Sequence, residues 1–538
     1  MSPQPPSPAE ARRDLVLLAL GAGLLFVSFL GAHDLWDPNE PLYGQAVVEM
    51  DGRQDWLIPT VNGEAFPEKP ILYFWLALAA AKLFGGVSEF TLRLPSALAG
   101  VGGVLLVYLL VLPYTDRTRA RIAAALTATT YIFFWTARLV QMDLLLTVCC
   151  LAAVLSISRV LDHGFDPRIG WSAAGLASAM GVLTKGPVGL IVPGLVVLGY
   201  AVATRRGRRL LDSAVVPGAM AFLLASAPWF VALWARGESE FLRELLYRQN
   251  FERFVAPWDH QTPWWYFLRE FWIDMAPWSF FVPLSVALPA RDESARRLDR
   301  LAWTWIVVVI VFFSLSASKR SPYIMSVAPA AAILVSGLAE RWMRGHLGSL
   351  RLRACSALTG LFGLLLVAGA VVAYRRLPDF PELGPAGPVT AALLLVAGLV
   401  ILAGLARPSR DRFAAPAALF AFVLTLYLTA AGLILPAVDV YKSWRPFGEQ
   451  IMAQVGSERP LYAYRIWKWR AAYTYFSGRP VPRLETEKEL IDYWASDEQV
   501  FLIVERGMLD EVQATLGEQD PLVAMPLGSN FVYLFSNR

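Results

Sequence analysis

The chain has 538 residues, of which 56% are hydrophobic and 17% charged, and its formal net charge is +4. Soluble globular proteins have about 45–50% apolar residues, and here the excess is gathered in long apolar blocks. Arginine clusters stand between the blocks, without interleaved aromatic residues or a nucleic-acid motif, which argues against a nucleic-acid-binding protein. The composition therefore predicts a polytopic α-helical membrane protein.

The first apolar block follows Arg12 and Arg13 and lacks a small-residue cleavage site, so we interpret it as an uncleaved first span. The three cysteines, Cys149, Cys150 and Cys355, lie inside apolar blocks, and we expect buried thiols without a disulfide framework. A bilayer core about 30 Å thick requires roughly 20 apolar residues per spanning helix. The candidate blocks are 15–32, 71–84, 93–112, 120–137, 142–160, 171–184, 187–203, 214–235, 274–290, 301–317, 321–340, 354–374, 388–405 and 413–436.

The positive-inside rule reduces these candidates to about 13 crossings. If every block crosses, only the first arginine cluster faces the cytoplasm, whereas all the main clusters face it if block 71–84 does not cross. That block is short and contains Lys82. We therefore interpret it as an interfacial or re-entrant helix, which places the N-terminus in the cytoplasm and the C-terminus outside.

The sequence from 441 to 538 is less apolar and predicts a small α/β domain outside the membrane, following a transmembrane catalytic domain over 1–440. Segments 460–464, 499–504 and 530–536 have the pattern of strands. Thr486 and Glu489 form the spacing of a capping box, which predicts a helix through Trp494. A further helix is expected over 507–516.

The first outer loop, 33–92, begins with acidic residues directly after the first span. Asp37, Asn39 and Glu40 precede Pro41, which suits the first turn of a helix. The expected helix has one apolar face and would lie on the membrane surface, with its apolar positions at Leu42, Ala46, Val47 and Met50. The acidic side chains either stabilise the positive end of this helix or take part in catalysis.

Other polar residues fall on the same outer side under this topology. They are Glu68, Lys69, Asp143, Lys185, His260, Lys319, Arg320 and Tyr323. Each has a simpler interpretation, such as a lysine extended to the interface, an acid at a helix start or a structural histidine. Together, however, acids and cations at headgroup level suit a phosphate-bearing lipid, with cations on the leaving phosphate and a carboxylate as base.

The stretch WDPNEPLYGQAVVEM…DWLIPTVNGEAFPEKPILYFWL resembles the first-loop signature of the bacterial aminoarabinose transferase and protein O-mannosyltransferase group of the GT-C superfamily. The segments FWTARLVQMDLLL, GVLTKGPVGL, HQTPWWYFL and FSLSASKRSPYI extend the resemblance along the chain. It implies an inverting transferase of the inner membrane, which moves a sugar from a polyprenyl (undecaprenyl) monophosphate donor to lipid A, another glycan or a protein on the outer face.

The family's acid pair corresponds to Asn39 and Glu40, so the first acid is an amide here. The resemblance therefore leaves Asp37, Glu40 or a residue elsewhere as the base. It implies that Lys69 binds donor phosphate, with Asp143, Lys185 and Tyr323 in the donor pocket. The resemblance also makes Glu68 and His260 possible ligands of a divalent metal, zinc or magnesium, although two ligands alone are a weak zinc site. We expect no other cofactor.

Two other functions fit a chain with many spans. A transporter or flippase of a lipid-linked sugar would also contain many helices and cationic groups. Such proteins, however, commonly have inverted repeats and polar residues near the bilayer midplane. This sequence has no recognisable repeat, and its mid-span positions are largely apolar. A non-catalytic envelope assembly protein, in which Asn39 marks lost activity, is the third interpretation.

Overall fold

The computed structural model describes residues 7–211, 213–252, 254, 262–286, 288, 292–406, 413–527 and 530–538. The chain is mostly helical and divides into two compact units. Unit 1 contains residues 1–30, 67–76 and 93–434, and unit 2 contains residues 31–66, 77–92 and 435–538. Unit 2 therefore combines segments from the first outer loop with the C-terminal part of the sequence.

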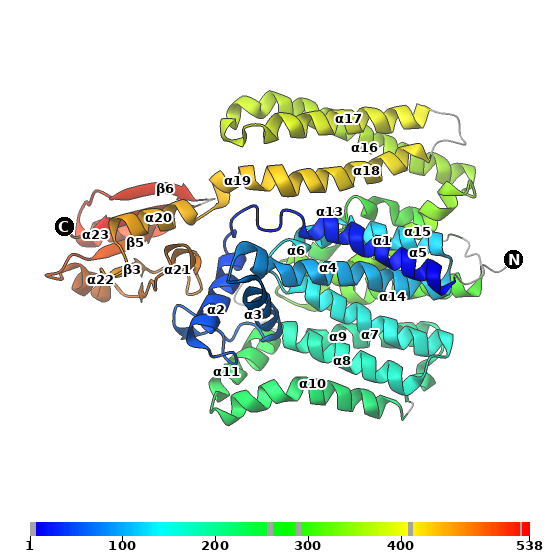
Figure 1. Cartoon of the computed structure of the whole chain (residues 1–538), viewed down its shortest axis with the longest axis horizontal. Helices are drawn as coiled ribbons and strands as arrows, with labels where there is room; N and C mark the ends of the chain where they lie inside the picture. Colours follow the sequence, from blue (N-terminus) through cyan, green and yellow to red (C-terminus); the bar gives the residue numbers. More distant parts are fainter. Residues whose placement is uncertain are drawn as a thin grey trace. The chain divides into compact units, whose positions relative to one another are not determined.

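Helices make up nearly all of unit 1 (Figure 1). Within the described ranges, 8 helices are long and apolar enough to cross a membrane. These candidate spans are Glu89–Tyr114, Asp143–His163, Val215–Ala235, Glu293–Leu315, Ser321–Met343, Ser349–Asp379, Ala386–Ala406 and Ala414–Lys442. Other helices are α1 (Pro8–Val27), α5 (Arg117–Ala128), α6 (Tyr131–Ala137), α8 (Pro167–Lys185), α9 (Val188–Ala203), α11 (Ser239–Arg243) and α13 (Tyr266–Asp274).

Five of the 13 predicted spans are not among these eight candidates, namely blocks 15–32, 120–137, 171–184, 187–203 and 274–290. Two of the five are also broken in the structure. Block 120–137 is divided between α5 and α6, because the Tyr131 amide bonds to the carbonyl of Ala276 (2.9 Å) and not to its own helix. Block 274–290 contains two short 3-10 helices, η4 (Trp278–Phe281) and η5 (Pro283–Ser285). Pattern alone cannot show such breaks, since the side chains remain apolar on both sides of them.

Helix α3 (Leu72–Phe84) has 13 residues. At 1.5 Å per residue it is about 20 Å long, which is less than the roughly 30 Å of a bilayer core. This length agrees with the interpretation of block 71–84 as a helix that does not cross. Tyr73 on α3 is fully buried, and its hydroxyl lies 2.8 Å from Oγ of Ser96 on α4 (Glu89–Val111).

Small residues allow close packing among the helices of unit 1. Helix α8 packs against α7 (Asp143–His163) and α10 (Val215–Ala235), as Figure 1 shows. A Cβ atom on Gly218 of α10 would lie 2.7 Å from the carbonyl oxygen of Trp171 on α8. Glycine at such a position lets two backbones approach, which favours helix association where lipid supplies no hydrophobic drive.

Unit 2 contains a five-stranded sheet in the order β4-β3-β5-β7-β6. The strands are β3 (Leu461–Tyr464), β4 (Arg483–Leu484), β5 (Phe501–Glu505), β6 (Val523–Leu527) and β7 (Asn530–Ser536). Strand β3 is parallel to β4 and β5, whereas β7 is antiparallel to β5 and β6. The three segments expected as strands correspond to β3, β5 and β7.

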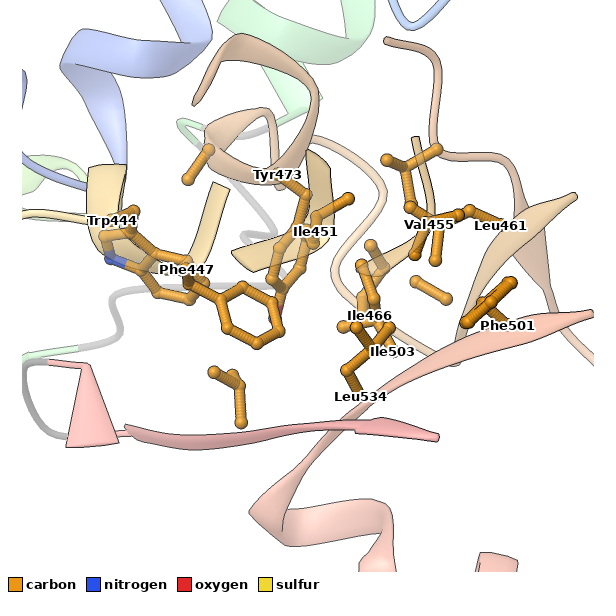
Figure 2. Close-up of a cluster of buried hydrophobic side chains, with 14 of the residues drawn as sticks. Trp444, Phe447, Ile451, Val455, Leu461, Ile466, Tyr473, Phe501, Ile503 and Leu534 are labelled. Atoms are coloured by element: carbon orange, nitrogen blue, oxygen red, sulfur yellow. The ribbon is translucent and has the colours of Figure 1, made fainter. Parts of the chain in front are cut away.

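One face of this sheet is covered by apolar side chains of α20 (Arg445–Gln454) and α21 (Ala472–Ser477) (Figure 2). Phe447 and Ile451 of α20 pack with Tyr473 of α21 and with Ile503 and Leu534 of the sheet. The other face is covered by α22 (Glu487–Trp494) and α23 (Leu509–Leu516). Residues on both faces are buried, which explains why β5 is a continuous apolar run.

The segments of the first outer loop in unit 2 form α2 (Asn39–Arg53) and the hairpin of β1 (Thr60–Val61) and β2 (Glu64–Ala65). Helix α2 is present as predicted, but its apolar positions are buried in protein and do not form an open face for lipid. The buried positions are Leu42, Ala46, Val47 and Met50. Within unit 2, α2 packs against β1 and α21.

Candidate active site

The first candidate region, in unit 1, is centred on Lys185 at the C-terminal end of α8. Its ammonium group donates a hydrogen bond to Oδ1 of Asp143, the first residue of α7, and lies 4.9 Å from the ring centroid of Tyr323. Gln141 donates to Oδ2 of the same carboxylate (3.1 Å). Asp143, Lys185 and Tyr323, which lie far apart in the sequence, are thus brought together, and we call them the lysine cluster.

A chain of hydrogen bonds connects the lysine cluster to the segment that follows Lys69. The Ser96 hydroxyl, which contacts Tyr73, donates to the carbonyl oxygen of Gln141 (3.0 Å). Because Gln141 also bonds to Asp143, the start of α7 is fixed to α3 and α4 within unit 1. Polar groups in an apolar surrounding are most stable when they are connected in this way.

Lys69 and Glu68 lie just before α3, where Lys69 Nζ donates to the carbonyl oxygen of Glu68 (3.0 Å). The Glu68 carboxylate is 3.9 Å from the same nitrogen, and both side chains are partly buried. His260, the other predicted metal ligand, lies outside the described residues. Among the residues that the structure describes, no group of three or more His, Cys, Asp or Glu side chains could hold a metal ion.

Lys319 and Arg320 precede the 3-10 helix η6 (Ser321–Val327), which carries Tyr323. Lys319 is 5% exposed and donates to the carbonyl oxygen of Thr262 (3.1 Å), and burial lowers its pKa. The Ser321 hydroxyl donates to the carboxylate of Asp274, at 2.8 and 2.9 Å from its two oxygens. The start of η6, and with it the ring beside Lys185, is therefore held by a buried carboxylate.

The second candidate region, in unit 2, is centred on Asp37. Its Oδ2 accepts a hydrogen bond from Arg470 (2.5 Å), and Nε of Arg470 lies 3.2 Å from Oε1 of Glu505 at the end of β5. Tyr473 donates to that Glu505 oxygen (3.1 Å). We call Asp37, Arg470, Tyr473 and Glu505 the arginine cluster. Burial raises the pKa of Asp37, while the Arg470 guanidinium acts in the opposite direction.

The two oxygens of Asp37 differ in their surroundings. Oδ2 is bonded to Arg470, whereas Oδ1 is buried and accepts no hydrogen bond from the described part of the chain. Glu40 is also buried, and its Oε2 accepts from the Trp36 amide (3.0 Å), so this side chain stabilises the turn before α2. Asn39 is partly buried at the first position of α2.

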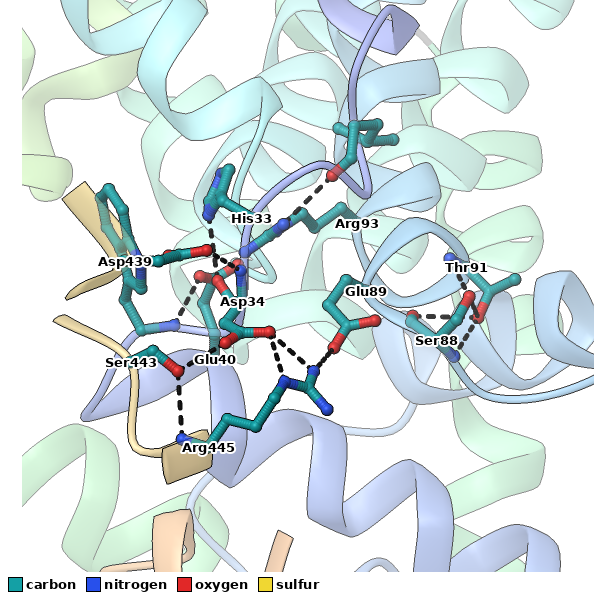
Figure 3. A network of polar contacts seen from close by, with 12 residues as sticks. His33, Asp34, Glu40, Ser88, Glu89, Thr91, Arg93, Asp439, Ser443 and Arg445 are labelled. Carbon is teal, nitrogen blue, oxygen red and sulfur yellow. Dashed lines mark hydrogen bonds and ion pairs between the residues drawn. The ribbon is translucent and has the colours of Figure 1, made fainter. Parts of the chain in front are cut away.

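A network of polar contacts fixes the start of the first outer loop within unit 2 (Figure 3). Asp34 accepts from Arg445 Nε (2.7 Å), and the same guanidinium reaches Glu89 (2.6 Å). Asp439 accepts from the Asp34 amide (2.8 Å) and from the Trp36 indole (2.7 Å). Residues 34–36 are thereby held by groups about 400 positions later in the sequence.

Known proteins give the chemical context for these clusters. Residues 68–234 match the family model for dolichyl-phosphate-mannose-protein mannosyltransferase. The undecaprenyl phosphate-α-4-amino-4-deoxy-L-arabinose arabinosyl transferase of Pseudomonas aeruginosa PAO1 is 32% identical over 431 residues, which cover 78% of this chain and 76% of the relative. The corresponding transferase of Aeromonas salmonicida is 29% identical and covers 70% of each chain.

The chain belongs to the aminoarabinosyl transferase family. Its members are glycosyltransferases, and the family was anticipated from the first-loop signature. The fold agrees, since the crystal structure of ArnT from Cupriavidus metallidurans bound to undecaprenyl phosphate superposes with a TM-score of 0.78, covering 97% of this chain and 98% of that chain at 21% identity. Its apo structure gives a TM-score of 0.74.

Several site residues of this transferase could not be selected from the sequence. Arg470 contacts the candidate Asp37, and Glu505 contacts Arg470, only because the chain folds back on itself. For the same reason Asp439 and Asp274 contact sequence neighbours of candidate residues, Trp36 and Ser321. One signal was available for Arg470, since the segment RIWKWR at 465–470 places three cations and two tryptophans in six residues of the less apolar tail. A segment with so many cations indicates ion pairing with acidic residues elsewhere in the chain.

Proposed function

We propose that this protein is an inverting glycosyltransferase that uses a polyprenyl monophosphate sugar. The donor lipid would be undecaprenyl phosphate, and the acceptor lipid A, another envelope glycan or a protein. Family membership carries the proposal, because curated relatives are named for transfer of aminoarabinose from undecaprenyl phosphate. The cationic groups of unit 1 support it, since a phosphate leaving group needs positive charge.

The donor phosphate would bind to Lys69, Lys185, Lys319, Arg320 and the hydroxyl of Tyr323. Lys185 is bonded to Asp143 in this structure, so a phosphate would share or replace that contact. Charge-assisted hydrogen bonds of this kind contribute about 1.5–3 kcal/mol each. They would strengthen as the bond between the sugar carbon and the phosphate oxygen breaks, because charge then accumulates on the phosphate.

Asp37 is the base in this proposal. An amide at position 39 cannot accept a proton from the acceptor, and the Glu40 carboxylate already accepts the Trp36 amide. Asp37 has one oxygen bonded to Arg470, while its other oxygen is buried and accepts no hydrogen bond from the described residues. This oxygen would take the proton of the attacking hydroxyl or amine, a contribution of roughly 10²–10⁴-fold to the rate.

The proposed topology has 13 crossings, with the N-terminus in the cytoplasm and residues 441–538 as a periplasmic α/β domain. Transfer would occur on the outer side of the inner membrane. A divalent metal bound by Glu68 and His260 belongs to the same proposal and would neutralise donor charge. Metal removal from the purified protein, followed by readdition of zinc or magnesium, tests this part alone.

The function is tested by mass spectrometry of lipids, glycans and proteins from cells with and without the gene. One acceptor class should gain the mass of one sugar residue only when the protein is present. Complementation with Lys69→Ala or Asp37→Asn should remove that mass, provided that immunoblots show equal protein in the membrane. If no acceptor changes and a lipid-linked sugar accumulates on one leaflet, the protein transports the sugar and does not transfer it.

A further inference from the structure

Arg470 lies between two carboxylates of unit 2 that come from distant parts of the sequence. Its NH1 group contacts Asp37 of the first outer loop at 2.5 Å, and its Nε contacts Glu505 at 3.2 Å. The side chains of all three are 13–19% exposed. A guanidinium with a fixed, planar set of donors is well suited to hold two carboxylates in one geometry.

The Arg470 side chain is itself held from several directions. Its guanidinium carbon lies 5.5 Å from the centroid of the Trp444 ring, which is 4% exposed. Its amide donates to the carbonyl oxygen of Trp467 (2.9 Å), in the turn between β3 and α21. Tyr473, 1% exposed, donates to the Glu505 oxygen that faces Arg470. The position of the guanidinium is therefore defined by the core of unit 2.

We propose that Arg470 is the positioning residue of Asp37, and that Glu505 balances the guanidinium so that Asp37 remains available as a base. This role rests on the proposed function, because it assumes that Asp37 takes the acceptor proton. Arg470 bonds only Oδ2, which restrains the carboxylate while Oδ1 accepts no hydrogen bond from the described residues. The C-terminal part of the chain thereby controls a catalytic group of the first loop.

The charges around Asp37 give the proposal an electrostatic signature. Burial is the largest influence on Asp37 and raises its pKa; the Arg470 cation opposes this, and the negative charge of Glu505 adds to it. Tyr473 faces the same carboxylates with a pKa far above its usual range, because it is fully buried, and stays neutral. Glu40 is three positions after Asp37 in the sequence and bonds to the Trp36 amide.

The test measures how the pH profile of transfer changes in variants of the full-length protein in nanodiscs. The donor is undecaprenyl phosphate-α-4-amino-4-deoxy-L-arabinose, and the acceptor is the one found by the mass comparison above. In the wild type, kcat should rise with pH as Asp37 loses its proton. Arg470→Gln should move this rise to higher pH by about 1–3 units, the effect of an arginine beside an aspartate. Glu505→Gln should move it to lower pH.

Two further variants separate position from charge. Arg470→Lys keeps the cation but loses the planar fork, so kcat should fall at least tenfold while the rise stays near its wild-type pH. Arg465→Gln is the matched control, because Arg465 lies in the same segment as Arg470 but pairs with Glu511 (2.5 Å). This variant should leave the pH profile unchanged. Unfolding temperatures of all variants identify any that fail to fold, and the charge test then rests on Glu505→Gln.

The outcomes distinguish failure of the Asp37 base assignment from failure of the Arg470 positioning role. If Asp37→Asn keeps wild-type activity, the base assignment in the proposed function is wrong. If Asp37→Asn is inactive but Arg470→Gln and Glu505→Gln retain the wild-type pH profile and kcat, the positioning role of Arg470 is overturned and the base assignment stands. Opposite shifts in these two folded variants support it, since a purely structural role would lower activity without moving the profile in both directions.

Discussion

Lys185 donates its ammonium hydrogen bond to Asp143 while also lying over the ring of Tyr323. Lys185 and Asp143 are 42 positions apart and come from different helices, α8 and α7. A partly buried cation with one carboxylate partner has its charge compensated before any ligand binds. Binding of a phosphate at this place would therefore depend on how firmly Asp143 holds the ammonium group.

Removal of the Lys185 charge should weaken binding of the donor lipid. We expect Lys185→Gln to raise the dissociation constant of undecaprenyl phosphate about 10–100-fold, the equivalent of one charge-assisted hydrogen bond of roughly 1.5–3 kcal/mol. Binding is measured with the purified protein in nanodiscs. Lys82→Gln removes the pair with Asp51 in unit 2 and serves as the control. Equal affinities for both variants and the wild type would contradict a phosphate site at Lys185.

An acid at position 39 should not replace Asp37. Asn39 is the first residue of α2, where a negative charge is favourable to the helix, so Asn39→Asp should fold normally. If Asp37 is the base, the double variant Asp37→Asn/Asn39→Asp should remain as inactive as Asp37→Asn alone. The rate of sugar transfer decides the matter, because recovery to within tenfold of the wild type would place the base at position 39.

Asn62 should be important for the stability of unit 2. Its side chain donates to the carbonyl oxygen of Val481 (2.7 Å) and accepts from the Val481 amide (2.9 Å), and its φ angle is +57°. Asn62→Gly removes these two bonds and a third from the Thr474 hydroxyl (3.3 Å). It should cost about 1–3 kcal/mol, since it leaves backbone groups of Val481 without their partner. Asn62→Ala should cost roughly 1 kcal/mol more because of the left-handed backbone.

The measurement for Asn62 is the thermal unfolding of the purified variants, followed by tryptophan fluorescence. Glycine keeps the backbone conformation and alanine does not, so their order separates the two causes. Two variants as stable as the wild type would show that these bonds do not hold the hairpin of β1 and β2 in solution.

The capping box of α22 should give unit 2 a pH-dependent stability. Thr486 accepts from the Glu489 amide (3.2 Å), and Glu489 accepts from the amides of Glu485 (2.7 Å) and Thr486 (3.1 Å). These backbone bonds lower the pKa of Glu489. The folded state then binds this proton less readily than the unfolded state, so the contribution is present above the unfolded pKa and is lost as pH falls through the lower, folded pKa.

Thr486→Ala should therefore lower the free energy of unfolding by about 0.5–2 kcal/mol at neutral pH. In Glu489→Gln, the free energy of unfolding should fall less between pH 7 and pH 4 than in the wild type. At pH 7 its loss of stability should be similar to that of Thr486→Ala. Denaturant unfolding at pH 7 and pH 4 measures both quantities. Thr515→Ala, which removes an exposed bond to Glu487, is the control variant.

Local patterns predicted the helices and strands well where sequence neighbours determine them. The capping box at Thr486 begins α22, and the pattern after Pro41 correctly predicted α2. Helix breaks were predicted less well, because the division after Ala128 depends on a hydrogen bond from Tyr131 to the distant Ala276. The burial of Met50 and its neighbours was missed for the same reason, since an amphipathic pattern does not specify whether lipid or protein covers the apolar side.

The candidate site shows a similar division. Asp143, Lys185 and Tyr323 were selected from the sequence, and the structure brings them into contact. The partners of Asp37 were not selected, because Arg470 and Glu505 are 433 and 468 residues away from it and no short motif connects them. Sequence reasoning therefore identified residues that carry charge, but not the residues that determine how this charge is used.

The pairing of residues 34–37 with residues 439–470 has a consequence for biosynthesis. The ribosome completes the early segment hundreds of residues before Asp439, Arg445 and Arg470 exist. Unit 2 therefore can acquire its native contacts only near the end of translation, after the intervening helices of unit 1 have been made. A chain terminated before residue 439 would contain every lysine proposed to bind the donor phosphate and would lack Arg470, the partner of Asp37. Under the proposed roles, such incomplete copies in the membrane would not transfer sugar.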